Sequence, residues 1–298
     1  MTRPVLAADV GGTQMRAALV DPEGRVLLRR SVPTPPEADV PSSLIDLIAT
    51  VAAAPTYGAA SHAVVGLPGA VDYEAGRLLW APHLPERWPE QLSRQELSAR
   101  LGLPAYVAND ADLAAVGEAA FGAGVGTTDI AYLTISTGIG AGVVHHGRLV
   151  CGRRSLGEVG HTVIDWRAWR QGSPCTLEEL GSGSGLARLA REAGLGALDA
   201  REVQAAAMRG EDRARAIWQG AIAACAVGVS NLVMSFYPSR VVVGGGLGRD
   251  PEFFDPLRDL VMSRPEHHPS DLSIVTSALG DDAGLAGAVA WAAATGHN

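Results

Sequence analysis

The chain has 298 residues, of which 47% are hydrophobic and 19% charged, and this composition describes a compact globular protein long enough for two domains. Its formal net charge of −8 argues against a general nucleic-acid binder. The basic residues are all arginine, and the lack of lysine excludes both the Gly-Lys-Ser/Thr phosphate loop and Schiff-base chemistry.

The cysteines and the start of the chain indicate the compartment. Cys151, Cys175 and Cys225 are few, odd in number and widely spaced, as is typical of reduced thiols in a cytosolic protein. The chain passes almost directly into an apolar run, so we expect no signal peptide and a cytoplasmic location. The apolar stretch 216–236 carries polar and glycine interruptions, and therefore predicts a buried helix and no membrane association.

A glycine turn follows the first apolar run. The apolar residues on either side of Asp9-Val-Gly-Gly-Thr13 predict two strands joined by this turn. Gly11 and Gly12 let backbone N–H groups approach an anion closely, and Thr13 adds a hydroxyl. The carboxylate of Asp9 is suited to a hydrated Mg²⁺ on a nucleotide. The motif indicates either a phosphate-holding hairpin or an ordinary β-hairpin.

The same pattern returns in the second half of the chain. Residues 130–144 again predict strand, turn and strand, with Thr137 and Gly138 in the turn. Residues 63–69 resemble residues 241–247, and a strand followed by an Ala-rich helix also occurs twice in the same order. Three matched landmarks predict a duplicated βββαβα unit, and hence an α/β fold with two domains around a cleft.

The remaining apolar patterns predict the helices and the domain organisation. We expect helices at 42–54, 89–101, 178–193, 200–208, 212–236 and 283–294. The small N-terminal domain is expected to span residues 1–108, and the C-terminal helix, about 283–298, folds back on it. The large C-terminal domain is expected to span residues 109–282.

Asn109-Asp110 is the second chemical candidate. Transfer of a phosphoryl group to an alcohol needs a carboxylate that orients the hydroxyl and accepts its proton. The sequence places Asp110 at a strand end, where such a group belongs. An Asp at a helix N-terminus is also a common cap. Both interpretations of Asp110 stay open at this point.

Glu158-Val-Gly-His161 is the third candidate. A carboxylate and an imidazole three residues apart, beside Gly157 and Gly160, can hold the hydroxyl groups of a polyol. The same pair can supply two metal ligands, or it can be a surface turn. The spacing does not decide among these.

Together these motifs resemble the ROK (repressor, open reading frame, kinase) family of sugar kinases. The resemblance covers nearly the whole chain in order, and the set of motifs is far more specific than any one of them. It implies the actin-like ATPase fold, related to ribonuclease H. The residues that carry it are Asp9–Thr13 with Arg16, Leu67–Val71, Asn109–Ala111, Ser136–Gly140, Gly157–His161, Leu177-Glu178 with Ser182-Gly183, and Gly244–Gly246.

The resemblance implies a role for each matching position. Asp110 is the expected base toward the sugar 6-hydroxyl. The expected sugar-binding residues are Gly69, Asn109, Asp110, Glu158, His161 and Glu178. The residues expected to bind the nucleotide are Asp9, Gly11, Gly12, Thr13, Thr137, Gly138, Gly244 and Gly245, with ATP as donor and Mg²⁺ near Asp9.

One departure from the family concerns a metal. Members usually carry a Cys-x-Cys-Gly-x-x-Gly-Cys zinc loop between the His and the Glu, but here residues 164–176 keep one cysteine. His161 and Cys175 supply at most two of the four ligands that structural zinc needs, so we predict no structural zinc. Packing of Trp166, Trp169 and Pro174 is the expected substitute. A second departure is Asp112, where the family usually has Asn.

The resemblance therefore predicts an ATP-dependent kinase for the 6-hydroxyl of a hexose, with glucose the first expectation. The alternatives are a kinase for mannose, N-acetylglucosamine or N-acetylmannosamine, and a non-catalytic sugar sensor. DNA binding is not expected, because repressors of the family carry an N-terminal helix-turn-helix and only three residues precede the first strand here. An actin- or chaperone-like ATPase is disfavoured by the sugar-type residues. A homodimer is common in the family.

Overall fold

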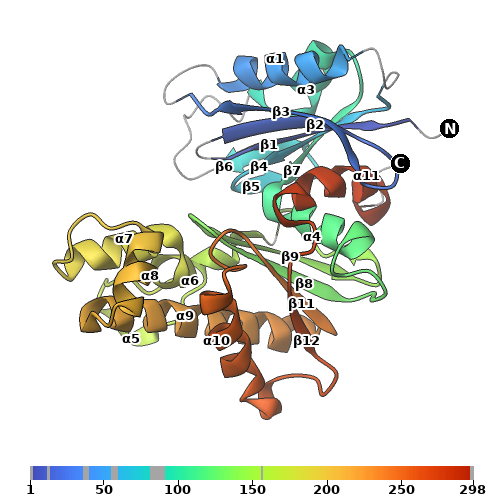
Figure 1. Cartoon of the computed structure of the whole chain (residues 1–298). Coiled ribbons are helices and arrows are strands. Elements are labelled where there is room, and N and C mark those ends of the chain that lie inside the picture. The colour runs from blue at the N-terminus through green and yellow to red at the C-terminus, as the bar shows by residue number, and fades with distance from the viewer. Residues whose placement is uncertain are drawn as a thin grey trace. The chain divides into compact units, whose positions relative to one another are not determined.

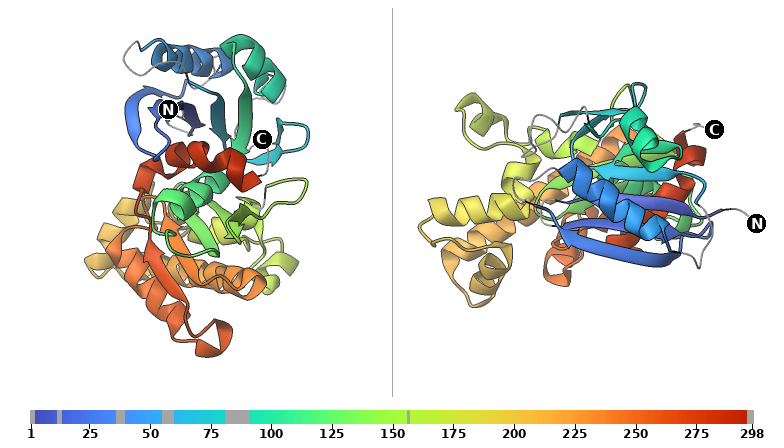
Figure 2. Two further views of the ribbon diagram at one scale, coloured as in Figure 1. Left: turned by 90° about the vertical axis from the view of Figure 1, so that its right-hand side faces the viewer. Right: turned by 90° about the horizontal axis from the view of Figure 1, so that it is seen from above.

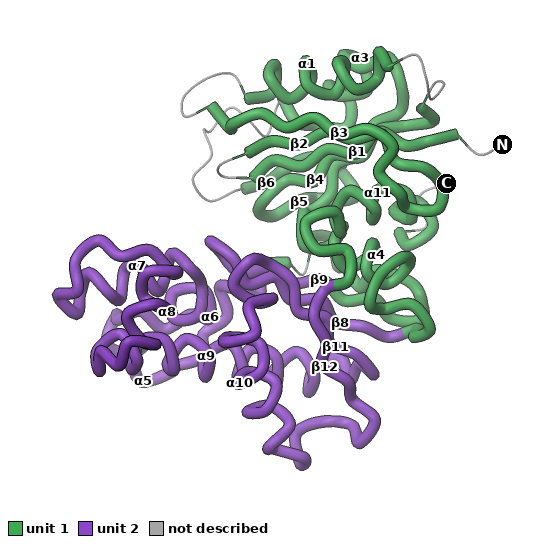
Figure 3. The backbone as a smooth tube through the Cα atoms, viewed as in Figure 1, with its two compact units in different colours: residues 1–128, 142–157, 278–298 green, residues 129–141, 158–277 purple. Residues whose placement is uncertain are grey.

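The computed structural model describes residues 3–11, 14–35, 40–54, 60–80, 91–155 and 157–295. The chain divides into two compact units, which Figure 3 shows in different colours. Unit 1 comprises residues 1–128, 142–157 and 278–298, and unit 2 comprises residues 129–141 and 158–277. The domain boundaries expected from the sequence stay a prediction.

The first sheet has five strands in the order β3-β2-β1-β4-β7. The first three form an antiparallel meander, and β4 and β7 then add in parallel to β1. β1 and β4 are apolar almost throughout because both faces of the sheet are covered. The strands are β1 (Val5–Val10), β2 (Gln14–Val20), β3 (Val26–Pro33), β4 (Ala63–Leu67) and β7 (Ala105–Asn109).

Helices cover both faces of this sheet. α1 (Val40–Ala52) and α3 (Arg94–Leu101) lie on one face, and α4 (Asp110–Phe121) and α11 (Ala283–Thr295) lie on the other (Figures 1 and 2). A small hairpin of β5 (Ala70–Asp72) and β6 (Arg77–Trp80) completes the strands here. The carboxyl end of β7 thus leads directly into α4.

The second sheet repeats the first, with the order β10-β9-β8-β11-β12. β11 pairs in parallel with both β8 and β12, as β4 does with β1 and β7. The strands are β8 (Ile130–Ile135), β9 (Ile139–His145), β10 (Arg148–Leu149), β11 (Arg240–Gly244) and β12 (Ser273–Thr276). The predicted βββαβα duplication is confirmed, and this arrangement is the actin-like ATPase fold.

The helices of unit 2 lie between β10 and β12 in sequence. They are α5 (Trp166–Arg170), α6 (Leu177–Gly181), α7 (Gly183–Glu192), α8 (Ala200–Met208), α9 (Asp212–Phe236) and α10 (Pro251–Met262). Short 3₁₀ turns add η1 (Gly157–His161) and η2 (Pro265–His267), and a third, η3 (Gly280–Asp282), follows β12 in unit 1. The predicted bounds of α8 and α9 agree with the structure.

The helix predicted over 178–193 is two helices. Ser182 has extended backbone angles, ends α6 and caps α7, and its Oγ accepts a hydrogen bond from Gly185 N at 3.0 Å. A serine between two glycines favours such a break because its hydroxyl replaces a helical hydrogen bond at the new N-terminus. α3 also starts later than predicted, after Ser93, and part of the predicted range lies outside the described residues.

Among the described residues, α9 is long and apolar enough to cross a membrane by length and composition alone. Of its most apolar window, 56% is buried within the fold. Trp218, Cys225 and Val229 are among its buried side chains, and the helix packs against α8, α10 and β8. That burial is typical of a core helix in a folded domain.

Candidate active site

Asp110 is the first residue of α4, at the point where β7 ends. Asn109 occupies the capping position, and its Oδ1 accepts hydrogen bonds from the backbone N–H groups of Ala111 (2.9 Å) and Asp112 (3.1 Å). Asp110 is exposed, and its Oδ1 also accepts from Ala111 N at 2.9 Å. The interpretation of Asp110 as the helix cap is therefore wrong, because Asn109 serves that purpose.

Asn109 also joins the helix start to the loop before β5. Its Nδ2 donates to the carbonyl oxygen of Gly69 at 3.0 Å, and Asn109 itself is buried. Gly69 has φ 93°, a backbone conformation that favours glycine. Three of the residues expected to bind the sugar, Gly69, Asn109 and Asp110, are thus brought together within unit 1.

Asp9 lies at the end of β1 and faces Arg16 across the first hairpin. Arg16 Nε donates to Asp9 Oδ1 at 2.9 Å, and Arg16 Nη2 donates to Oδ2 at 2.5 Å, which makes the pair bidentate. Burial raises the pKa of the Asp9 carboxyl, and the Arg16 guanidinium opposes this rise. The Asp9 carboxylate is thus fixed beside the turn by its two hydrogen bonds from Arg16.

The turn of the first hairpin is described only in part. Gly11 is exposed, its N–H donates to Gln14 O at 2.9 Å, and its carbonyl accepts from Thr34 Oγ1 at 2.7 Å. Gly12 and Thr13, both expected to bind phosphate, lie outside the described residues.

The second hairpin, between β8 and β9, is braced by α7. Gly183 N donates to Ser136 O at 2.8 Å, and Ser184 N donates to Thr137 O at 3.1 Å. The side chain of Thr137 is exposed. The turn that carries Thr137 and Gly138 is therefore fixed by the N-terminus of a helix that begins five residues after Glu178.

Glu178 joins α6 to the same hairpin. Its Oε2 accepts a hydrogen bond from Ile139 N at 2.8 Å. A Cβ atom placed on Gly138 would stand 2.6 Å from this oxygen, so the carboxylate can approach the turn only because residue 138 is glycine. One carboxylate oxygen of a residue expected to bind the sugar thus holds the turn expected to bind phosphate.

Glu158 and His161 lie on one turn, η1, in unit 2. Their Oε2 and Nε2 atoms are 3.4 Å apart, and the two side chains are 31% and 46% exposed. Burial raises the pKa of Glu158, the Glu178 carboxylate adds to this rise, and His161 opposes it. The turn presents a half-buried carboxylate beside an imidazole, which suits a polyol.

Gly244 is the last residue of β11 and Gly245 follows it, and both lie against the end of β8. The N–H groups of Leu247 and Gly248 both donate to Ile135 O, at 3.1 and 3.0 Å. The loop after β11 is therefore anchored to the strand that leads into the second hairpin, and Gly245 has φ 81°.

The segment 164–176 is ordered by hydrogen bonds and not by the expected apolar packing. Trp166 and Trp169 are 55% and 63% exposed, so the prediction that they pack to stabilise the loop is wrong. Glu179 Oε2 accepts instead from Cys175 N, Thr176 N and Thr176 Oγ1, at 2.9 to 3.0 Å. A capping box on α6 thus closes the loop.

Cys175 is buried, and burial raises the pKa of its thiol, which disfavours the thiolate that zinc requires. The lack of structural zinc stays a prediction.

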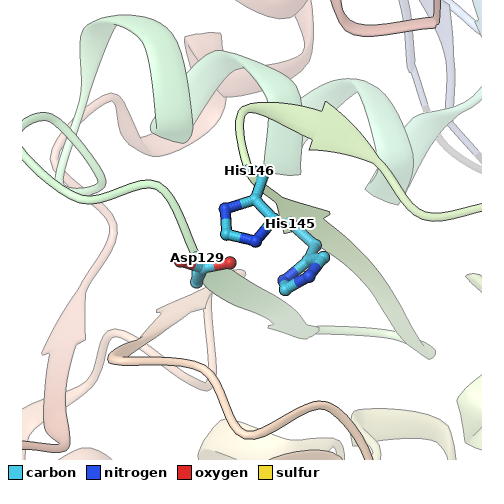
Figure 4. A group of neighbouring side chains, drawn as sticks. All are labelled: Asp129, His145 and His146. Carbon is cyan, nitrogen blue, oxygen red and sulfur yellow. The ribbon is translucent and has the colours of Figure 1, made fainter.

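His145 and His146, at the end of β9, have ring centroids 4.1 Å apart, and Figure 4 shows them with Asp129. Because Asp129 belongs to unit 2 and the histidines to unit 1, we assign no metal site to the three.

Tyr73 and Asp112 are functional candidates that sequence reasoning missed. Both are buried, and the Tyr73 hydroxyl donates to Asp112 Oδ2 at 2.5 Å. The sequence carries one signal, the unusual Asp at 112, but nothing local connects it with a tyrosine 39 residues earlier.

Comparison with known proteins identifies relatives along almost the whole chain. The chain is 40% identical over 294 residues to the bifunctional enzyme NanE/NanK of Brucella melitensis, covering 97% of this chain and 54% of that protein. It spans about half the length of this relative. It is 30% identical over 290 residues to the N-acetylmannosamine kinase of Salmonella arizonae, covering 95% of this chain and 96% of that one.

A solved structure is similar over the same extent. The ROK family glucokinase of Streptomyces griseus, in complex with glucose and AMPPNP, has a TM-score of 0.78 and 30% identity, covering 97% of this chain and 98% of that chain. The model of the ROK family matches residues 5–295. With this match and the duplicated fold, the chain belongs to the ROK family.

Proposed function

We propose that this protein is an ATP-dependent sugar kinase that phosphorylates the 6-hydroxyl of a hexose. The observation that carries the proposal is the start of α4, where Asn109 caps the helix and Asp110 presents an exposed carboxylate beside the Gly69 loop. This is the position of the base that the family resemblance implies. Relatives named as sugar kinases over the same extent support the assignment.

In the proposed reaction, Asp110 orients the sugar hydroxyl and accepts its proton. The hydroxyl oxygen forms a bond to the γ-phosphorus as the bond from that phosphorus to the β,γ-bridging oxygen breaks, and ADP leaves. The proton passes to the Asp110 carboxylate and then to solvent. Positioning and charge stabilisation supply most of the catalysis in such transfers, and the carboxylate contributes about 10²-fold or more.

The two hairpins and the loop after β11 are the proposed nucleotide site. The glycine turns at Gly11, Gly138 and Gly245 let phosphate oxygens approach the backbone closely, and the exposed side chain of Thr137 adds a hydroxyl, which suits a chain without lysine. When bound, Mg²⁺ would neutralise negative charge on the phosphate groups. Both oxygens of Asp9 accept from Arg16, so Asp9 fits a hydrated Mg²⁺ through water, which this ion retains readily.

The proposed sugar residues are Gly69, Asn109 and Asp110 in unit 1, and Glu158, His161 and Glu178 in unit 2. Paired carboxylates and an imidazole can accept and donate to several hydroxyl groups at once. We propose glucose as the first substrate, as with the glucokinase that is similar over 97% of this chain.

An N-acetylhexosamine kinase is the second candidate. The match to an N-acetylmannosamine kinase, 30% identical over 290 residues, favours it. The loop 164–176, which leads from the Glu158–His161 turn to Glu178, is ordered by Glu179 in this chain, and its shape bears on which sugar fits.

The test is ADP release with Mg-ATP against glucose, mannose, fructose, N-acetylglucosamine and N-acetylmannosamine at equal concentrations. The Asp110→Asn variant, purified identically, corrects for contaminating kinases. Preference for glucose supports the first candidate, and preference for an N-acetylhexosamine supports the second. Sugar binding without turnover would point to a sensor and overturn the proposal.

The setting of this activity is also proposed. We expect a cytoplasmic protein with a small-molecule sugar as its partner, no nucleic-acid or membrane partner, and a homodimer as one arrangement. The expected division into domains 1–108 with 283–298, and 109–282, belongs to the same proposal.

A further inference from the structure

Beneath Asp110, a tyrosine and an aspartate form a buried contact. Tyr73 follows β5, and its hydroxyl donates to Asp112 Oδ2 at 2.5 Å, within the range of a charge-assisted O–H···O⁻ bond. Tyr73 is 7% and Asp112 0% exposed. Trp291 of α11 packs against the Tyr73 ring at 5.4 Å between centroids, so the phenol is fixed from its other side.

The contact closes a ring of hydrogen bonds at the start of α4, which links Tyr73, Asn109 and Asp112. The backbone N–H of Asn109 donates to the Tyr73 hydroxyl at 3.2 Å, and the N–H of Asp112 donates to Asn109 Oδ1 at 3.1 Å. Asn109 Nδ2 in turn holds the Gly69 carbonyl. Asp110 lies between the two residues that the Tyr73 hydroxyl binds, so its backbone is held from both sides.

We propose that Tyr73 and Asp112 are positioning residues for the sugar kinase reaction, because their contact ties Asn109 to Asp112, fixes the backbone between them and so sets the direction of the Asp110 carboxylate. This rests on the proposed function. It also accounts for Asp112: a carboxylate there accepts from a tyrosine that strand β5 brings to the last residue of β7. Burial and the Asp112 charge raise the pKa of Tyr73 well above its ordinary value, so the phenol stays a donor.

The test compares Tyr73→Phe with Asp112→Asn and with the double variant. Tyr73→Phe leaves a buried carboxylate without its phenol donor, and we expect kcat to fall about 10- to 100-fold while the sugar KM changes less than about threefold. Asp112→Asn keeps an oxygen that accepts from Tyr73, so its loss in kcat is smaller. Tyr237→Phe, on a 65% exposed tyrosine, is the matched control.

The double variant removes the unpaired charge and keeps the experiment informative if Tyr73→Phe folds poorly. We expect it to recover stability but not the full kcat. A lower melting temperature in Tyr73→Phe with unchanged kcat in the folded fraction would show a merely structural role and overturn the proposal.

A second readout does not depend on activity. Hydrogen–deuterium exchange of the amides at 109–113 should speed up at least tenfold in Tyr73→Phe and less in Asp112→Asn. A wild-type protein inactive on every sugar would overturn the proposed function, and the exchange rates would still decide the positioning role. Equal exchange in wild type and Tyr73→Phe would overturn it.

Discussion

Gly117 of α4 and Gly287 of α11 lie against each other where the two helices cross. A Cβ atom placed on Gly117 would stand 2.9 Å from Gly287 N, and one placed on Gly287 would stand 3.0 Å from Gly117 N. The same atoms would approach the carbonyl oxygens of Ala283 and Leu113 even more closely. The backbones of the helix that begins at Asp110 and of the last helix are therefore in direct contact.

Because the two helices cross so closely, a single methyl group added at this crossing is expected to destabilise the fold. We expect Gly287→Ala to lower the free energy of unfolding by about 3 kcal/mol, because the neighbouring atoms are backbone and cannot move aside cheaply. The matched control is Gly220→Ala in α9, where an added Cβ meets nothing within 4 Å. There the higher helix propensity of Ala should add about 0.5–1 kcal/mol. Thermal unfolding of both variants checks the contrast, and equal stability would contradict the close packing.

Local patterns in the sequence predict the sheets and most helices because burial on both faces imposes continuous apolar runs. The bounds of α8 and α9 follow from their periodicity. The helical periodicity does not reveal the break at Ser182, although Gly-Ser-Gly-Ser-Gly contains the residues that favour a new helix start. Contacts that join distant segments leave no such local signal.

Two parts of the candidate site illustrate this limit. The resemblance identifies Glu178 as a residue for the sugar, but its bond to Ile139 N, 39 residues away, comes only from the fold. The apolar side chains of Trp166 and Trp169 predict packing, yet both are exposed and the capping residue Glu179 orders the loop. Residue types predict chemistry here better than they predict which atoms meet.

Glu118 is a buried carboxylate that fixes the start of η3 to the end of α4. It is 0% exposed and accepts from the N–H groups of Ala123 (2.7 Å), Ala278 (3.2 Å) and Leu279 (3.0 Å). Glu118→Ala leaves these amides without their acceptor, and we expect a loss on the order of 3 kcal/mol. Urea unfolding measures it. Glu192→Ala, which removes an exposed ion pair, should change stability by at most about 0.5 kcal/mol; a similar loss in both would refute the role of Glu118.

The double role of Glu178 predicts different effects from two substitutions. Glu178→Gln keeps an oxygen that accepts from Ile139 N, so the KM for ATP should change less than threefold while the sugar KM rises about 10-fold or more. Glu178→Ala loses that acceptor as well, and both KM values should rise. Steady-state kinetics with each substrate varied separates them. An unchanged KM for ATP in Glu178→Ala would show that the contact does not hold the phosphate turn.

The raised pKa of Glu158 predicts a pH dependence. As the pH falls, Glu158 is protonated above its ordinary pKa of 4.5, and a protonated carboxyl loses acceptor capacity for sugar hydroxyls. We expect kcat/KM for the sugar to fall on the acid side with a midpoint above 4.5, and Glu158→Gln to remove that limb while lowering kcat/KM throughout.

Stability supplies an independent check on the same group. Between pH 4.5 and the raised pKa, the folded state binds the proton more tightly than the unfolded state, so the Glu158 contribution falls as the pH rises through this window. Glu158→Gln should flatten that part of the stability profile. A stability profile identical to that of the wild type would mean that burial does not raise the pKa of the Glu158 carboxyl.

Asp110→Asn is the decisive substitution for the proposed chemistry. The amide cannot accept the proton of the sugar hydroxyl, so turnover should fall about 10²-fold or more. The fold should survive, because Asn109 supplies the helix cap and the substituted side chain keeps an Oδ1 that can accept from Ala111 N. Sugar affinity, measured by calorimetry, should change by less than about fivefold.

The matched control is Asp46→Asn, an exposed carboxylate on α1, which should keep full turnover. Turnover within a few-fold of the wild type in Asp110→Asn would assign the proton transfer to another group, whereas loss of sugar binding together with turnover would make Asp110 a binding residue. Only lost turnover with retained binding identifies the base.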